Sequence, residues 1–196
     1  MRIVLLGAPG SGKGTQATLL TERLGVPHVS TGVLLREAVA QGTELGKKAK
    51  AVMDRGELVS DDIMLGLIAE RLSQADAQKG FVLDGYPRNL SQAEALDTLL
   101  ARIGQPVDEA IEIEVSTEQV VQRIAKRAHE EGRSDDTEDV VRNRMRVYEE
   151  QTAPVSAYYA EQGLLTRVLG EGSIEEVAQR IAGVLAQAEA ERSAAG

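Results

Sequence analysis

Short apolar runs alternate with longer segments of helical periodicity along the whole chain. The apolar runs predict strands at 2–7, 27–30, within 80–88, and at 109–115 and 164–170. Apolar positions recurring every three or four residues predict helices at 13–24, within 31–55, at 60–73, 89–103, 117–128, 138–161 and from 174 onward. Strands alternating with helices of this length predict an α/β fold, in which a five-stranded parallel sheet carries helices on both faces.

Three segments add detail to this plan. Residues 30–60 hold helices where one crossover would suffice, and 128–137 are polar and turn-prone, so we expect both stretches to be moving parts. The low-complexity tail is expected to be a fraying helix end. The closing helix should bury one face, made of Ile174, Val177, Ala178, Ile181, Ala182 and Leu185.

Composition narrows the functional classes. A chain of 196 residues with 42% hydrophobic and 27% charged positions is typical of one globular domain with room for a small appendage. The net charge of −9 argues against non-specific nucleic-acid binding. No apolar stretch approaches the roughly 20 residues that cross a bilayer. With no cysteine, disulfides and cysteine-ligated zinc are excluded, which fits a cytoplasmic protein.

The stretch "GAPGSGKGTQA", residues 7–17, follows the first strand directly and has the spacing of a phosphate-binding loop. Its glycines allow the backbone N–H groups to surround an anion, while Lys13 and a helix N-terminus add positive charge. The alternative is a glycine-rich turn without a ligand. The usual Ser or Thr after the lysine is replaced by Gly14, and a threonine follows only at Thr15.

Asp84 ends the strand pattern "FVLD". A carboxylate at the C-terminal edge of a parallel strand, beside a phosphate loop, is well placed to hold Mg²⁺ or its waters. The alternative is a turn-forming Asp before Gly85.

Several arginines suggest more than one anion-binding position in an otherwise acidic chain. Each alone would more often be a solvated surface charge. Together they fit phosphoryl transfer, which must hold a donor and an acceptor in line and neutralise spreading charge. They are Arg36, Arg88, Arg123, Arg127, Arg133 and Arg144.

Six motifs together resemble the nucleoside monophosphate kinases, and among them the adenylate kinases. These are "GAPGSGKGTQ", "STGVLLR", "GELVSDDI", "GFVLDGYPRNLSQA", "GRSDDT" and "VYEEQTAPVSAYY", and the likeness covers about residues 1–185. The resemblance implies a P-loop NTPase-type fold and reversible phosphoryl transfer from Mg·ATP to AMP, giving two ADP. It also explains Gly14-Thr15, because this family's loop has that form.

The resemblance implies roles for single residues. ATP would be bound by Gly10, Ser11, Gly12, Lys13, Gly14, Thr15, Arg123, Arg127 and Gly172. AMP would be bound by Thr31, Arg36, Glu57, Leu58, Val59, Gly85, Tyr86, Pro87, Arg88, Gln92, Arg133 and Arg144. Catalytic charge stabilisation would come from Lys13, Arg36, Arg88, Arg127, Arg133 and Arg144. Mg²⁺ would be held mainly by phosphates and water, with Asp84 and Thr15 as close neighbours, and no zinc is expected.

The same resemblance divides the chain into a core (1–29, 60–121 and 138–196), an AMP-binding flap (30–59) and a short lid (122–137). Its partners would be ATP, AMP and ADP, and the protein would be a monomer. One position departs from the family: Val33 stands where "STGDxxR" has an aspartate, for which we expect a local effect on stability or AMP affinity.

Two other functions remain open from the sequence. A UMP/CMP kinase would share the loop and the arginines, but such relatives carry Ala for Thr31 and Asn for Gln92. Both residues also have plain alternatives, because Thr31 could cap a helix and Asn89-x-x-Gln92 has capping-box spacing. A nucleotide-dependent switch would use the loop without a small acceptor, yet we find no guanine-reading NKxD motif.

Overall fold

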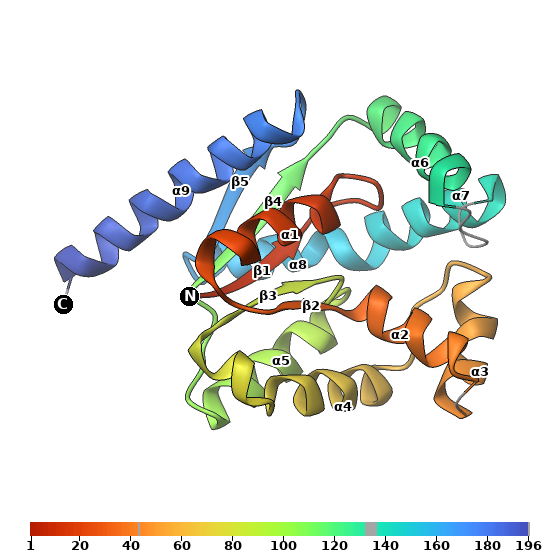
Figure 1. Ribbon diagram of the computed structural model, residues 1–196, viewed down its shortest axis with the longest axis horizontal. Helices are drawn as coiled ribbons and strands as arrows, with labels where there is room; N and C mark the ends of the chain where they lie inside the picture. Colours follow the sequence, from red (N-terminus) through yellow and green to blue (C-terminus); the bar gives the residue numbers. More distant parts are fainter. Residues whose placement is uncertain (43, 132–136, 196) are drawn as a thin grey trace.

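The computed structural model describes residues 1–42, 44–131 and 137–195. Its strands form a parallel sheet in the order β2-β3-β1-β4-β5 (Figure 1). In the central register, Leu5 pairs with Asp84 on one side and with Ile111 on the other. The strands are β1 (Arg2–Leu6), β2 (His28–Ser30), β3 (Phe81–Asp84), β4 (Glu109–Glu114) and β5 (Leu165–Leu169).

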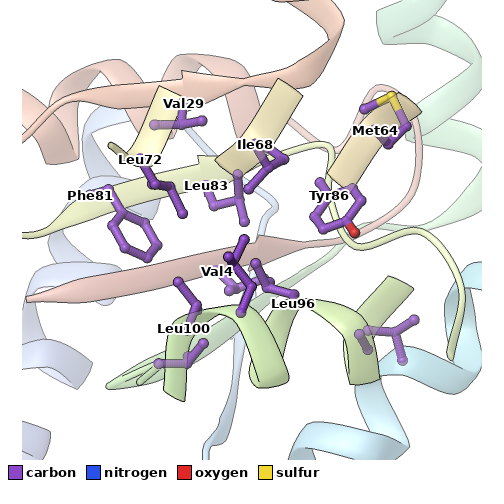
Figure 2. Packing of buried hydrophobic residues seen from close by; sticks show 14 of the residues in the cluster. Val4, Val29, Met64, Ile68, Leu72, Phe81, Leu83, Tyr86, Leu96 and Leu100 are labelled. Carbon is purple, nitrogen blue, oxygen red and sulfur yellow. The ribbon is translucent and has the colours of Figure 1, made fainter. Parts of the chain in front are cut away.

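Helices cover both faces of the sheet, as the alternating pattern predicts. One face packs against α1 (Lys13–Leu24) and α9 (Ile174–Ala195). The other packs against α4 (Asp61–Leu72), α5 (Leu90–Arg102) and α8 (Ala153–Glu161). Figure 2 shows the second core, which is aliphatic apart from Phe81 and two tyrosines and includes Val4, Ile68, Leu72, Leu83, Leu96 and Leu100.

The two central strands create the crevice that positions a site. β1 and β3 are neighbours in the sheet, but the helix after β1 lies on one face and the helix after β3 lies on the other. Where successive connections leave in opposite directions, the chain ends of the strands diverge and leave a ligand-sized opening. The loops at 7–12 and 85–89 both emerge there.

Residues 30–60 hold two short helices, α2 (Thr31–Ala40) and α3 (Glu44–Met53). The main packing partner of α3 is α2, and α2 in turn contacts α4. This pair extends from the end of β2 at the edge of the sheet (Figure 1). A short 3-10 helix, η1 (Ala75–Lys79), leads into β3 and was not expected from the sequence.

The segment expected to be turn-prone begins as helix. α6 (Thr117–Glu131) continues three residues past its expected end at 128, and residues 132–136 lie outside the described chain. The helix expected over 138–161 is in fact α7 (Glu138–Val147), a π-helical turn η2 (Tyr148–Thr152) and α8. Pro154 explains the interruption, because proline has no N–H to donate and its ring crowds the carbonyl four residues earlier.

The closing helix α9 buries Val177, Ile181 and Leu185, as its periodicity predicts. Ile174 was expected on the same face, but this residue is 51% exposed because the helix begins there, at the rim of the sheet. The tail is helical to Ala195, and its Ala, Glu and Gln residues are strong helix formers. Within the described ranges, no helix combines the length and the apolar character that a bilayer span requires.

Candidate active site

The loop after β1 turns sharply into α1. Gly7, Gly10 and Gly12 have φ of 141°, 79° and 99°, values that a side chain would disfavour. Gly12 is the N-cap of α1, so the unpaired N–H groups of the first helical turn face the loop. The loop therefore offers a positively polarised hollow suited to an anion, with Lys13 at its rim.

The Lys13 ammonium is folded back onto this loop. Nζ donates to the carbonyls of Gly7 (2.7 Å) and Ala8 (3.0 Å) and lies 3.5 Å from the Ser11 hydroxyl. Burial lowers the pKa of Lys13 to about 8, although the charge of Asp84 opposes that shift. The two carbonyls and the hydroxyl are acceptors for the N–H groups of the ammonium, and an anion in the loop would compete with them.

Asp84 ends β3 directly beside the loop, paired in register with Leu5 of β1. Its residue is 9% exposed, and Oδ2 lies 3.4 Å from His28 Nε2. Burial alone would raise the pKa of Asp84, but His28 and the Lys13 charge outweigh burial and hold the pKa below its usual range. A Cβ built on Gly14 would stand 3.8 Å from Oδ2, so this ionised carboxylate faces the start of α1.

Arg123 and Arg127 of α6 face the same cavity, as their spacing of four predicts. Arg123 joins two loops, because its guanidinium donates to the carbonyls of Ser11 (3.1 Å) and Gly170 (2.8 Å). The middle of α6 is thereby tied both to the phosphate loop and to the loop after β5.

Two adjoining cavities open at this edge of the sheet. The larger, about 780 Å³, is lined by the loop at 7–14, Asp84, Arg123, Arg127 and Gly172. The smaller, about 50 Å³, lies between α2, the segment 56–59 and the start of α5. Arg36, Arg88 and Arg144 line both cavities. Three guanidinium groups from three separate elements therefore meet where the two cavities join.

Thr31 belongs to the smaller cavity and does not cap a helix. The N-cap of α2 is Ser30, whose hydroxyl accepts from the N–H of Val33 at 3.4 Å. The buried Thr31 hydroxyl instead donates to the carbonyl of Gly85 at 2.9 Å. Thr31 thus links the start of α2 to the loop after β3. Val33 is 43% exposed and lines the larger cavity with an apolar side chain.

Gln92 is 2% exposed and its amide makes two contacts within the protein. Oε1 accepts from the N–H of Arg88 (2.7 Å), and Nε2 donates to Asp61 Oδ1 (2.9 Å). The capping alternative is borne out in part, because Asn89 Oδ1 accepts from the N–H of Gln92 (2.8 Å). An amide has two N–H donors and two lone pairs, so one of each is left for a ligand.

The structure brings the candidate residues together. Each candidate lines one or both cavities, except Arg133, which lies outside the described residues. The larger cavity takes the candidates for ATP, together with Tyr86 and Pro87. Thr31, Glu57, Val59 and Gln92 line the smaller cavity, and Leu58 and Gly85 line both.

Among the residues that line the larger cavity and that sequence reasoning missed are His28, Lys126 and Thr152. A single histidine in a short strand carries no pattern, and its approach to Asp84 depends on the pairing of β2 with β3. Thr152 lies in the motif "VYEEQTAPVSAYY", which was noted for its resemblance alone.

The protein side chains in the larger cavity suit a cation that is held mainly by the phosphates of a bound nucleotide. Asp84 is the acidic residue that the described part of the chain contributes to the larger cavity, and no group of three His, Asp or Glu side chains there could enclose a metal. One ionised carboxylate beside a phosphate loop fits Mg²⁺, which keeps several waters and binds through one or two carboxylates and phosphate oxygens. Thr15 lines the same cavity.

A parallel α/β sheet with a glycine-rich loop, a buried carboxylate and clustered arginines defines a P-loop phosphoryl-transfer protein. The family model described as adenylate kinase matches residues 5–164. The chain therefore belongs to the adenylate kinase family, and the predicted family, fold class and phosphotransferase class are confirmed.

Curated relatives match along nearly their whole length, and each is named adenylate kinase. One from Stenotrophomonas maltophilia (strain R551-3) is 60% identical over 181 residues, covering 92% of this chain and 97% of the relative. One from Xanthomonas euvesicatoria pv. vesicatoria (strain 85-10) is 58% identical over 185 residues, covering 94% and 99%. One from Xylella fastidiosa (strain M23) is 58% identical over 182 residues, covering 93% and 97%.

Proposed function

We propose that this chain transfers the terminal phosphoryl group of Mg·ATP to AMP, reversibly, giving two ADP. One observation carries the proposal: Arg36, Arg88 and Arg144 line both cavities, at the place where a donor and an acceptor phosphate would meet. Family membership supports the choice of adenine nucleotides, since the relatives are named for that activity.

The chemistry is a direct in-line displacement. A phosphate oxygen of AMP forms a bond to the γ-phosphorus of ATP while the bond from that phosphorus to the β–γ bridging oxygen breaks, so no covalent enzyme intermediate is needed. The residues proposed for charge stabilisation are Lys13, Arg36, Arg88, Arg127, Arg133 and Arg144. Their fixed charges would stabilise the negative charge that spreads over the transferring oxygens.

The loop from Gly10 to Thr15 would hold the ATP phosphates, with Lys13 leaving the loop carbonyls for the transferring group. Mg²⁺ bound with ATP would neutralise charge on the phosphate oxygens. Asp84 would hold its waters from the end of β3, with Thr15 close by. Arg123, Arg127 and Gly172 would complete the ATP side.

On the acceptor side, Thr31 and Gln92 would read the base, and the segment from Glu57 to Val59 would enclose it. The amide of Gln92 keeps one N–H and one lone pair for this purpose, which matches the amino group and a ring nitrogen of adenine. Gly85 to Arg88 would bind the AMP phosphate.

We further propose that residues 30–59 act as an AMP-binding flap and 122–137 as a short lid over a core of 1–29, 60–121 and 138–196. Closure of both would exclude water, which otherwise would accept the phosphoryl group. The cysteine-free sequence suits a cytoplasmic location, and we propose a monomer, which sedimentation would check.

The test is a ³¹P NMR time course with ATP, Mg²⁺ and one acceptor at a time: AMP, CMP, UMP or none. We expect ADP to form with AMP and the reaction to stop at a mixture of the three adenine nucleotides. A faster reaction with CMP or UMP would keep the mechanism but remove the proposed roles of Thr31 and Gln92. Release of free phosphate alone would point instead to a nucleotide-dependent switch.

A further inference from the structure

The hydroxyl of Thr152 makes a contact that the proposed function does not use. Thr152 is the last residue of the π-helical turn η2, and its Oγ1 donates to the carbonyl oxygen of Arg88 at 2.6 Å. The two residues are 64 positions apart in the chain. A partly buried hydrogen bond between such distant segments fixes their relative position.

Arg88 is held at three points by this contact and two others. Its N–H donates to Gln92 Oε1 (2.7 Å), its Nε donates to the carbonyl of Gly85 (2.7 Å), and its carbonyl accepts from Thr152. Both peptide groups that flank Arg88 are therefore fixed, one by α5 and one by η2. Of these three bonds, the one from Thr152 reaches Arg88 from an element outside the segment 85–92.

The π-helical turn directly follows the helix that carries Arg144. Thr152 follows Arg144 by eight residues, or about 12 Å along a helix axis at 1.5 Å per residue. Arg144 lies in the last turn of α7, and it lines both cavities together with Arg88. The widened turn, in which the N–H of Ala153 donates to the carbonyl of Tyr148, connects the helix of Arg144 to the anchor on Arg88.

We propose that Thr152 is a positioning residue for phosphoryl transfer. Its hydroxyl fixes the backbone of Arg88. The guanidinium groups of Arg88 and Arg144 are thereby held in fixed positions relative to each other around the acceptor phosphate. This inference rests on the proposed function, because it takes Arg88 to bind that phosphate. Displacements of an ångström in such groups cost large factors in rate. π-Helical turns inside longer helices frequently occur at functional sites.

The test compares Thr152→Val with Thr152→Ser. Valine keeps the shape of threonine without the hydroxyl, whereas serine keeps the hydroxyl. We expect Thr152→Val to lower kcat/KM for AMP on the order of tenfold, the loss of one well-placed hydrogen bond, while KM for ATP stays within about twofold. Thr152→Ser should recover most of the difference. If Thr152→Val does not fold, Thr152→Ala replaces it.

A control and a double-mutant cycle separate positioning from general loss of stability. Ser156→Ala removes another hydroxyl of the following helix, which donates to Glu112 Oε1 (2.7 Å) away from Arg88. We expect it to lower thermal stability without raising KM for AMP. If Thr152 acts through Arg88, then Thr152→Val should cause no further loss in an Arg88→Ala background, measured at high enzyme concentration.

Three outcomes would overturn the inference: full activity of Thr152→Val, equal losses in both backgrounds, or a Ser156→Ala variant with the same loss for AMP. Each of them presupposes that the unmodified protein transfers phosphate to AMP. If the unmodified protein does not, the proposed function itself has failed, and the two failures are distinguishable in one set of assays.

Discussion

At the scale of single residues, Lys13 is a group whose contacts and charge should change when a nucleotide occupies the site. In the structure its ammonium donates to two carbonyls of the phosphate loop, and burial lowers its pKa to about 8. Anionic phosphates would replace those carbonyls and favour the charged form, which raises the pKa again. The pKa of the free protein and that of the nucleotide complex should therefore differ.

This difference predicts a pH dependence. Lys13 is charged below its pKa and neutral above it, so kcat/KM for ATP, which reports the free protein, should fall as pH rises through about 8. The corresponding fall in kcat, which reports the complex, should occur at higher pH. Initial rates between pH 7 and 10 would measure both.

Lys13→Arg is the matched control, because a guanidinium stays charged throughout this range. That variant should be slower, since a planar guanidinium does not match the point charge of an ammonium. The fall of kcat/KM for ATP near pH 8 should, however, disappear. A fall that persists unchanged in Lys13→Arg would assign the titration to another group.

At the scale of elements, the packing of α3 on α2 depends on one glycine. A Cβ built on Gly46 would lie 2.0 Å from the carbonyl oxygen of Ala38, far closer than any real contact. Gly46→Ala should therefore push the two helices apart and destabilise the fold by about 1–3 kcal/mol, as overpacked sites do. Because α2 carries Thr31 and Arg36, KM for AMP should rise while KM for ATP changes little.

Gly66→Ala provides the control within a helix that has open space. No atom lies within 4 Å of a Cβ built on Gly66 in α4. Alanine there should stabilise the protein by about 0.5–1 kcal/mol through the lower entropy of the unfolded chain. Urea unfolding of both variants would decide the matter, and equal effects of the two substitutions would contradict the packing argument.

Elements with a strong local signal could be predicted from the sequence. The strand at 2–7, the strand within 80–88 and the phosphate loop between β1 and α1 carry their pattern within a few neighbouring residues. They appear where expected, as β1, β3 and the turn into α1. Pro154 was the available signal for a break in the helix over 138–161, but the continuing apolar period outweighed it, and a proline does not indicate that the break takes the form of a π-helical turn at Tyr148–Thr152. Ile174 was misassigned since periodicity does not tell where a helix leaves the sheet.

The candidate site shows the same division. The loop and Asp84 follow from position after a strand, and the arginines were singled out as a group in an acidic chain. The separate role of each arginine and the acceptor residues came from family resemblance. The approach of His28 to Asp84 and the anchor of Thr152 on Arg88 depend on contacts across 56 and 64 positions, respectively, and no local pattern encodes them. Val33 shows a limit of another kind, since its exposed apolar side chain in the larger cavity has no explanation in the structure.

At the scale of the whole molecule, the two cavities predict that the two nucleotides act on different parts of the chain. α2 and the segment 56–59 wall the smaller cavity and also contribute to the larger one, whereas the described part of α6 borders the larger cavity alone. In Figure 1 these elements stand on either side of the open edge of the sheet. α2 and α3 pack mainly on each other. Such a segment opens locally at a low free-energy cost, so a ligand that fills its cavity should raise the free energy of local opening most there.

Hydrogen exchange measured with one nucleotide at a time would test this division. AMP alone should slow the exchange of amides in α2 and α3 and leave α6 unchanged, whereas Mg·ATP alone should slow α6 and the start of α1. Each sample contains either a donor or an acceptor but not both, so no phosphoryl transfer takes place during the measurement.

CMP in place of AMP serves as the control and should give weaker protection. Mass action stabilises the entire fold to some extent, so the comparison is made on amides that exchange by local opening and not on β1 or β3. Equal protection of both regions by either nucleotide would mean that the flap and the lid do not respond to different nucleotides. The proposed three-part organisation would then be wrong.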